Sequence, residues 1–376
     1  MRERIRRLGP IPFDQFLELA LYDDDGGFYT AVGAAGADDR GDFLTSPELG
    51  PLFGAVLARA LDAWWEELGA PDPFVVVEAA AGVGTLAKAV LASSPECAPA
   101  LRYLLVERSE RLRARQPTML AMEPAATVLG PMAPSDEDEF DGPQALPGGG
   151  PRVASLDALP VGPFTGVVLA NELLDNLPFA LLERTTEGWC EVHIGEADDD
   201  GFVEVLTPAK AADAELAARL VPDAAVSSRV PLQSVAVDWL RTAFRSLHHG
   251  RVVVIDYAST TPELATRPQG EWLRTYRGGG RGDDPLARPG SQDITVEVCV
   301  DQLARIQPPA LDRRQAEFLA AHGIDVLRDQ AAAAWQAAAA RPDLGALEAR
   351  SRVAEAASLV DPSGLGGFRV LEWQVR

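Results

Sequence analysis

A short apolar run that leads into a glycine turn is the feature that most limits what this chain can fold into. Residues 74–78 are rich in β-branched side chains, which is typical of a parallel strand buried on both faces. A glycine turn at 79–84 and a helical stretch at 85–92 follow, and a second strand leads to Glu107. Strand, glycine turn, helix and strand with a terminal acid form the nucleotide-binding βαβ pattern. The sequence therefore predicts an open α/β sheet with a Rossmann-like centre.

The glycines and acids around this turn are compatible with two cofactors. Gly82, Gly84 and Ala87 fit the dinucleotide pattern G-x-G-x-x-G/A, and Glu107 lies 23 residues beyond Gly84. However, Glu78 ends the first strand, and three residues separate it from Gly82. S-adenosylmethionine has no phosphate and carries positive sulfonium and ammonium groups, so a carboxylate beside the turn favours it over NAD. Glu107 would then bind the two ribose hydroxyls, and an NAD-dependent dehydrogenase is the alternative.

Charge and composition disfavour several classes of function. The chain has 34 basic and 56 acidic residues, a net charge of −22, which favours a cationic partner over nucleic acid because phosphates need a basic stripe. No apolar run is long enough to span a bilayer, and the N-terminus lacks the apolar segment of a secretory signal. The three cysteines form no CxxC pair, and the four histidines form no HExxH motif. We therefore expect no metal site, no membrane association and a cytoplasmic location.

The order of the predicted elements indicates how the chain is divided. We expect an N-terminal helical cap at residues 1–70 and a Rossmann-like methyltransferase domain at 71–376. Insertions are expected at about 123–150 (a loop), 178–250 (beginning with a hairpin of 189–194 and 202–206) and 258–310 (including a loop at 267–293). Further strands are predicted at 152–156, 166–170, 252–256 and 368–375, and helices extend to about residue 358.

Six further motifs follow one another along the chain, and as a set they are far more specific than the glycine turn alone. They are Gly41-Asp-Phe-Leu-Thr-Ser-Pro47, Val106-Glu-Arg-Ser109 with Gln116, Asn171-Glu-Leu-Leu-Asp-Asn-Leu-Pro178, Ile255-Asp-Tyr257, Pro289-Gly-Ser-Gln-Asp-Ile-Thr295 and Gly364-Leu-Gly-Gly-Phe-Arg-Val-Leu371. Together they resemble the MidA-like family of S-adenosylmethionine-dependent methyltransferases, which includes a mitochondrial complex I assembly factor that methylates arginine. The resemblance covers about residues 9–373. It implies a class I methyltransferase fold, S-adenosylmethionine as cofactor and protein arginine N-methylation.

The resemblance also implies which residues bind the cofactor. Asp42, Phe43 and Thr45 would fold over it, and the other positions lie in the glycine turn and at strand ends: Glu78, Ala80, Gly82, Gly84, Thr85, Glu107, Arg108 and Asn171. Three residues depart from the family pattern, because Ala80 and Ala258 replace glycines and Val83 replaces a residue that is often polar. An alanine at position 80 is tolerated if φ is negative, but it costs about 1 kcal/mol or more if φ is positive.

Candidate catalytic carboxylates follow the fourth and fifth strands. Glu172 and Asp175 come just after Asn171 and lie three residues apart, so in a helical turn both face one side. Together they could hold a guanidinium through bidentate hydrogen bonds and direct one nitrogen at the methyl group. Asp256 ends the fifth strand at the same edge of the sheet. The alternative is that Asn171 caps this helix and that the two acids favour its positive N-terminus.

These observations predict an S-adenosylmethionine-dependent methyltransferase, and the resemblance favours arginine in a cationic protein as its acceptor. Two other functions stay open. One is N- or O-methylation of a small molecule. The other is a catalytically reduced protein that binds partners, a possibility that rests on Ala80, Val83 and Ala258.

Overall fold

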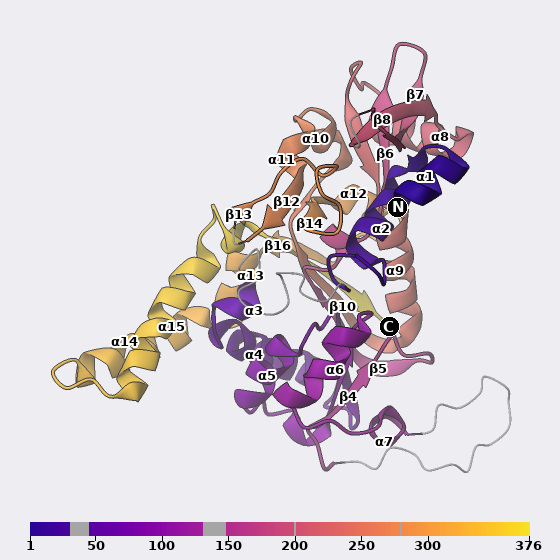
Figure 1. Ribbon diagram of the computed structural model, residues 1–376. Coiled ribbons are helices and arrows are strands. Elements are labelled where there is room, and N and C mark those ends of the chain that lie inside the picture. Colours follow the sequence, from indigo (N-terminus) through magenta and orange to yellow (C-terminus); the bar gives the residue numbers. More distant parts are fainter. Residues whose placement is uncertain (31–44, 131–147, 199–200, 279) are drawn as a thin grey trace, which may run out of the picture. The chain divides into compact units, whose positions relative to one another are not determined.

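The chain folds into two compact units, each built from three stretches of sequence. The computed structural model describes residues 1–30, 45–130, 148–198, 201–278 and 280–376 (Figure 1). Unit 1 comprises Met1–Leu44, Leu173–Arg241 and Tyr257–Pro308, and unit 2 comprises Thr45–Glu172, Thr242–Asp256 and Pro309–Arg376. This division differs from the boundary expected at residue 70, because the helices at 46–67 belong to unit 2 together with the sheet.

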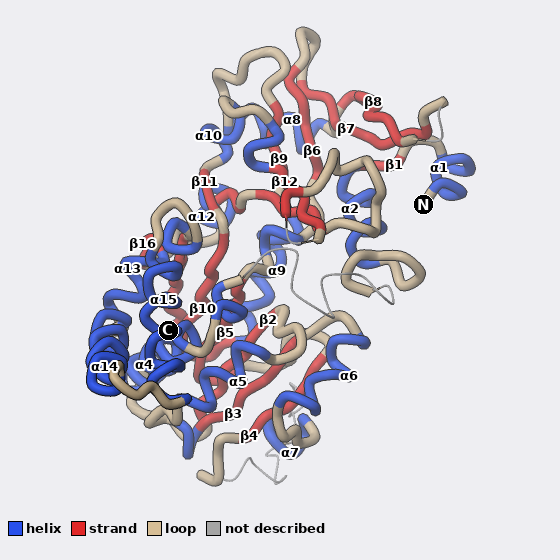
Figure 2. The backbone as a smooth tube through the Cα atoms, turned by 60° about the vertical axis from the view of Figure 1, so that its left-hand side comes forward, coloured by secondary structure: helices blue, strands red, loops and turns tan. Residues whose placement is uncertain are grey.

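Unit 2 is organised around a seven-stranded sheet in the order β16-β17-β10-β5-β2-β3-β4 (Figure 2). The five strands from β10 to β4 are parallel, and β17 and β16 run antiparallel to their neighbours at one edge. This arrangement confirms the predicted open α/β fold. The strands span Phe74–Ala79 (β2), Leu101–Val106 (β3), Arg152–Leu156 (β4), Phe164–Asn171 (β5), Leu247–Asp256 (β10), Leu311–Arg314 (β16) and Arg369–Val375 (β17).

The central strands are buried along their length, as their continuous apolar sequences predict. Every residue of β2 and β3 is buried, which requires cover on both faces of the sheet. Strands β2 and β5 also approach closely at one point, where a Cβ atom added to Gly166 would lie 1.8 Å from the carbonyl oxygen of Val75. Glycine at this position therefore allows the observed register between the two strands.

Helices surround this sheet in unit 2. They are α3 (Ser46–Leu49), α4 (Leu52–Glu67), α5 (Thr85–Ala92), α6 (Glu110–Met119), α7 (Ala125–Leu129), α13 (Gln315–Ala321), α14 (Ile324–Ala338) and α15 (Leu344–Val360), with short 3₁₀ turns at Ala98–Ala100 and Leu365–Gly367. Helix α4 packs on α13 through the rings of Trp64 and Phe318, whose centroids lie 6.2 Å apart. Helices α14 and α15 form the long hairpin drawn in yellow in Figure 1.

Unit 1 combines a five-stranded antiparallel sheet with two smaller sheets. The larger sheet contains β1 (Ile11–Pro12), β6 (Ala180–Arg184), β7 (Trp189–Glu196), β8 (Phe202–Pro208) and β9 (Arg229–Leu232). The smaller sheets contain β11 (Ala258–Ser259) with β15 (Val298–Cys299), and β12 (Leu273–Arg277) with β13 (Gly280–Arg281) and β14 (Asp293–Val296). The helices of unit 1 are α1 (Arg2–Leu8), α2 (Phe13–Tyr22), α8 (Ala211–Leu220), α10 (Thr261–Ala265), α11 (Gln269–Trp272) and α12 (Val300–Ala304), and the unit also contains the 3₁₀ turn η2 (Leu174–Asn176). Helix α9 (Ser234–Ser246) begins in unit 1 and ends in unit 2.

Most predicted elements are present, and one expected loop is not. The predicted hairpin is present as β7 and β8, in which Cys190 pairs with Pro208 and Glu196 pairs with Phe202. The segment 267–293 is not simply a loop, because β12 lies within it and pairs with β14. In that strand Leu273 and Thr275 are buried, a short alternation that the surrounding arginines and glycines obscure. None of the described helices is both long and apolar enough to cross a bilayer.

Candidate functional site

The turn between β2 and α5 bends sharply through three residues with positive φ. These are Ala80 (φ 56°), Gly82 (φ 53°) and Gly84 (φ 90°). The amide of Ala81 donates to the carbonyl of Val106 at 3.0 Å and so ties the turn to the end of β3. A Cβ atom added to Gly82 would meet nothing within 4 Å, so glycine is needed there for its backbone conformation and not for lack of space.

Glu107 joins this turn to the strand that follows. Its carboxylate accepts hydrogen bonds from the amide of Gly82 at 2.9 Å and from the amide of Ser109 at 2.8 Å. The side chain is buried, and burial raises its pKa above the usual value despite these hydrogen bonds. A carboxylate has about four acceptor positions, so the amides of Gly82 and Ser109 do not use the whole capacity of Glu107, which is expected to bind ribose hydroxyls.

Gln116 has a structural role that sequence reasoning did not assign. Its amide nitrogen donates to the carbonyl of Gly82 at 2.8 Å, and its amide oxygen accepts from the Ser155 hydroxyl at 2.5 Å. The residue is completely buried in α6, the helix that follows Glu107 in the chain. The available signal was its place in the quoted motif that begins at Val106. Both backbone polar groups of Gly82 are therefore hydrogen-bonded: its amide donates to Glu107, and its carbonyl accepts from Gln116.

Glu78 lies beneath the turn at the end of β2. Its carboxylate accepts a hydrogen bond from the Tyr103 hydroxyl at 2.7 Å, and both residues are buried. Burial raises the pKa of Glu78 to about 7, although the hydrogen bond from Tyr103 opposes the shift. Near neutral pH this carboxyl is therefore divided between its protonated and ionised forms. A nearby positive group would favour the ionised form.

The end of β5 carries Asn171 and Glu172, and Glu172 has an unusual backbone conformation. Its φ is 52°, in the left-handed region, and its amide donates to the carbonyl of Ile255 at 2.8 Å. One carboxylate oxygen of Glu172 accepts from the side-chain amide of Asn171 at 3.1 Å and from the amide of Ser46 at 3.4 Å. The buried Oδ1 of Asn171 accepts no hydrogen bond from any residue that the structure describes. This acceptor fits a donor supplied by a ligand, such as an ammonium group.

The expectation that Glu172 and Asp175 share one face of a helical turn is wrong. Glu172 has left-handed φ, and the short 3₁₀ turn η2 begins only at Leu174. The alternative that Asn171 caps a helix beginning at Glu172 fails for the same reason. Asp175 is buried within η2 and belongs to unit 1, whereas Glu172 ends a stretch of unit 2.

The remaining predicted site residues have varied surroundings. Asp256 is buried at the end of β10, where it pairs in register with Arg369 of β17. Thr45 is the N-cap of α3 and forms a capping box with Glu48. Arg108 is exposed, and its carbonyl accepts from the Arg113 guanidinium at 2.7 Å. Thr85 is partly buried as the first residue of α5, and Asp42 and Phe43 lie outside the described residues.

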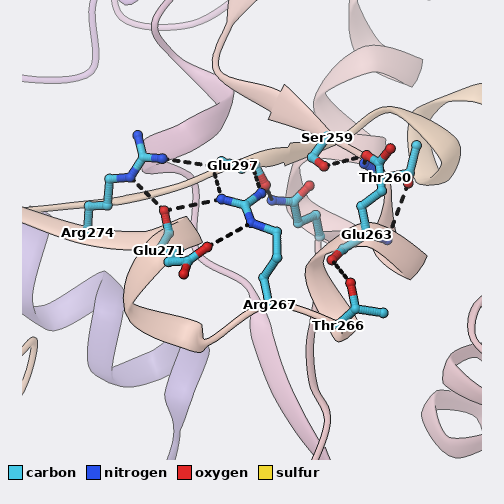
Figure 3. Close-up of polar contacts among 9 residues, drawn as sticks. Ser259, Thr260, Glu263, Thr266, Arg267, Glu271, Arg274 and Glu297 are labelled. Atoms are coloured by element: carbon cyan, nitrogen blue, oxygen red, sulfur yellow. Dashed lines mark hydrogen bonds and ion pairs between the residues drawn. The ribbon is translucent and has the colours of Figure 1, made fainter. Parts of the chain in front are cut away.

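The arginine-rich segment before β14 pairs with acids. Glu297 is buried and accepts hydrogen bonds from Arg267 at 2.7 and 2.9 Å and from Arg274 at 2.8 Å (Figure 3). Arg274 also donates to the carbonyl of Glu271 at 2.8 Å, and its guanidinium carbon lies 5.4 Å from the ring centroid of Tyr257. Arg267 and Arg274 therefore neutralise the buried carboxylate of Glu297.

Comparisons with known proteins agree with this geometry. A family model described as S-adenosyl-L-methionine-dependent methyltransferase matches residues 56–321. The human mitochondrial protein arginine methyltransferase NDUFAF7 is 27% identical over 348 residues, which cover 86% of this chain and 72% of the human protein. The Drosophila melanogaster homologue is 27% identical over 309 residues, which cover 79% and 67% of the two chains. A crystal structure from Burkholderia thailandensis with bound S-adenosylhomocysteine has a TM-score of 0.78 and 29% identity, covering 100% of this chain and 90% of that one.

These findings settle the cofactor class and correct one expectation. The structural neighbour holds S-adenosylhomocysteine, the product form of the expected cofactor, so S-adenosylmethionine and not NAD is the cofactor. The expected cytoplasmic location is contradicted, because the human and Drosophila relatives are named as mitochondrial proteins. The family model covers well over half of the chain. The chain belongs to this family and is an S-adenosylmethionine-dependent methyltransferase with a class I fold.

Proposed function

We propose that the chain transfers a methyl group to a guanidinium nitrogen of arginine in a cationic protein. The names of the relatives support arginine as the acceptor, since they are called protein arginine methyltransferases. The net charge of −22 supports a cationic target, because it speeds the encounter with a basic protein. The observation that carries the proposal is Glu172, a carboxylate in left-handed backbone conformation at the carboxyl end of a central strand.

The proposed cofactor site uses the turn after β2 and the neighbouring strand ends. Glu107 binds the ribose hydroxyls, Gly82 and Gly84 shape the turn, and the ionised form of Glu78 favours the positive sulfonium. Asn171 accepts a hydrogen bond from the ammonium group through its Oδ1. Thr45, Ala80, Thr85 and Arg108, together with Asp42 and Phe43, complete the proposed set.

The proposed chemistry needs little from the protein beyond orientation and control of a proton. S-adenosylmethionine supplies the methyl group and the leaving group in an in-line displacement. Glu172 holds the guanidinium by a charge-assisted hydrogen bond and accepts the proton that the methylated nitrogen loses. Asp175 and Asp256 contribute negative charge that favours a cationic side chain. Fixing the acceptor nitrogen in this way replaces an encounter in solution by a reaction between bound groups.

The test is methyl transfer to arginine peptides. The purified chain is incubated with S-adenosylmethionine labelled in its methyl group and with a set of basic peptides that contain arginine. Matched peptides carry lysine in place of every arginine and so keep the charge. We expect label on arginine only, identified by mass spectrometry, and a rate that falls as salt weakens attraction between the acidic enzyme and basic peptide.

Two other results would point to other functions. Equal labelling of the lysine peptides, or labelling of small amines alone, would contradict arginine as the acceptor. A folded protein that binds S-adenosylhomocysteine but labels nothing would instead favour the catalytically reduced, partner-binding alternative.

A further inference from the structure

The 3₁₀ turn η2, which carries Asp175, is held in place at the next residue. The side-chain amide of Asn176 donates to Oδ1 of Asp293 at 2.9 Å and to the carbonyl of Ile294 at 3.2 Å. The backbone carbonyl of Asn176 accepts from the Tyr22 hydroxyl at 3.1 Å. Asn176 is therefore bound from two directions, by the first residues of β14 and by the last residue of α2.

A second tyrosine completes this arrangement. The Tyr29 hydroxyl donates to Oδ1 of Asp293 at 2.9 Å, the same oxygen that accepts from Asn176. The rings of Tyr22 and Tyr29 are stacked, with centroids 5.7 Å apart and an interplanar angle of 20°. Burial and then the nearby Asp293 raise the pKa of Tyr29 well above its usual value, so its hydroxyl stays protonated and can donate. Tyr22, Tyr29, Asn176 and Asp293 all belong to unit 1, and we call them the η2 clamp.

The backbone hydrogen bonds that close the turn are long. The amides of Asn176 and Leu177 donate to the carbonyls of Leu173 and Leu174, both at 3.3 Å. A single 3₁₀ turn with long hydrogen bonds is not a stable element in isolation. Contacts from neighbouring elements must therefore supply its order. Tyr22, Asp293 and Ile294 supply such contacts, each through a hydrogen bond with Asn176.

We propose that the η2 clamp is a positioning device that fixes Asp175 for the acceptor. This inference rests on the proposed function, which gives Asp175 a role beside the acceptor. Asp175 directly precedes Asn176 in the chain, so a fixed Asn176 fixes the backbone from which the Asp175 carboxylate projects. Asp175 is itself buried in unit 1, the unit that contains the whole clamp.

The clamp gives a role to motif residues that the chemistry leaves unused. Asn176 lies in the motif that begins at Asn171, and Asp293 lies in the motif that begins at Pro289. Neither residue needs to touch the cofactor or the acceptor to act in this way. Their roles depend on hydrogen-bond geometry, which separates them from a residue that acts by its charge alone.

Hydrogen–deuterium exchange of the whole protein tests the clamp without any acceptor. Asp293→Ala removes the acceptor shared by Tyr29 and Asn176, and we expect the amides of Asn176 and Leu177 to exchange about three- to tenfold faster. Asp293→Asn keeps an oxygen at the same position and should change the exchange by less than about twofold. Thr185→Val is a matched control, because it removes a 2.9 Å hydrogen bond to Gly188 elsewhere in unit 1. Unchanged exchange at Asn176 and Leu177 in Asp293→Ala would overturn the proposal.

Turnover then shows whether the clamp serves catalysis. With the labelled arginine peptides, Asp293→Ala and Tyr29→Phe should each lower kcat by about three- to tenfold and change the KM for S-adenosylmethionine by less than about twofold. Asp293→Asn should restore most of the lost kcat, and Thr185→Val should match the wild type. Parallel losses in Asp293→Asn and Asp293→Ala would contradict a geometric clamp. A wild-type enzyme that ignores arginine peptides would refute the proposed function instead, and the exchange result would stand separately.

Discussion

Two turns at the carboxyl edge of the sheet in unit 2 share an unusual backbone feature and differ in what compensates it. After β2, Ala80 has φ of 56°, and after β5, Glu172 has φ of 52°. For residues with a Cβ atom this left-handed conformation costs about 1–2 kcal/mol. Ala80 is exposed and has no polar side-chain group, whereas the Glu172 carboxylate accepts hydrogen bonds from Asn171 and Ser46.

The difference shows that the same strain has separate origins in the two turns. Ala80 occupies a position where the local path of the chain favours glycine, and its exposed methyl group buries little apolar surface that could offset the cost. At Glu172 the left-handed residue carries the carboxylate that the proposed chemistry needs. Strain that persists together with a functional side chain is typical of active sites. We therefore propose that the turn after β2 binds the cofactor and that Glu172, in the turn after β5, carries the acceptor chemistry beside the proposed cofactor contact of Asn171.

The largest expected effect is a loss of turnover when Glu172, in the turn after β5, is replaced. Glu172→Gln keeps the size of the side chain and removes its ability to accept a proton, so kcat should fall by at least about 100-fold. The Kd for S-adenosylhomocysteine should change by less than about twofold, measured by calorimetry. Glu187→Gln, an exposed residue in the hairpin between β6 and β7, is the control and should have wild-type kcat. A matching loss of cofactor affinity in Glu172→Gln would indicate a structural role for Glu172.

The second expected effect lies in cofactor binding. Glu107→Ala removes the proposed ribose contacts and also the hydrogen bond to Gly82 that shapes the turn. We expect the binding free energy for S-adenosylhomocysteine to weaken by about 1–3 kcal/mol, so its Kd should rise roughly 5- to 150-fold. Glu110→Ala, an exposed acid at the start of α6, should leave the Kd unchanged. Equal affinity in the wild type and Glu107→Ala would remove Glu107 from the site.

The sequence predicts the buried parts of these turns better than their polar details. Strands β2, β3 and β5 follow from continuous apolar runs, because a strand covered on both faces needs no polar alternation. Glu107 and the glycines follow from spacing along a single βαβ unit. These features depend on residues that are close together in the chain.

Features that depend on distant contacts or on one dihedral angle could not be predicted in this way. Spacing of the acids at 172 and 175 is typical of a helix, and only the left-handed φ of Glu172 prevents one. The hydrogen bond between Tyr29 and Asp293 joins residues 264 positions apart. Strand β12 is short and lies among arginines and glycines, so its alternation was too weak to identify.

A third prediction uses the buried carboxyl beneath the cofactor turn. The pKa of Glu78 is raised from 4.5 to about 7, so the folded state binds more protons than the unfolded state between these values. Its contribution to stability is therefore full below about pH 4.5 and is lost as the pH rises through about 7. A cationic cofactor favours the ionised form, so affinity for S-adenosylmethionine should rise about tenfold from pH 6 to pH 8.

The control for this prediction is Glu78→Gln, which cannot ionise. Its affinity for S-adenosylmethionine should be nearly independent of pH over the same range when measured by calorimetry. If the wild type showed the same flat profile, ionisation of Glu78 would have no part in cofactor binding.

The smallest expected effect concerns the uncompensated strain at Ala80. Ala80→Gly removes about 1–2 kcal/mol of strain and adds about 0.5–1 kcal/mol of unfolded-state entropy, so the free energy of unfolding should rise by about 0.5–1 kcal/mol. Ala81→Gly is the matched control, because Ala81 is buried with ordinary φ and should lose stability. Denaturant unfolding measures both variants. A loss of stability in Ala80→Gly would show that the methyl group has a compensating contact.

The most direct test of the division between the two turns is one calorimetric series with S-adenosylhomocysteine, using the wild type, Glu107→Ala and Glu172→Gln, with NAD as a control ligand. We predict binding to the wild type and to Glu172→Gln with similar affinity, weaker binding to Glu107→Ala, and no binding of NAD. Equal losses in the two variants, or full affinity in both, would contradict the assignment of cofactor binding to the turn after β2 and of chemistry to the turn after β5.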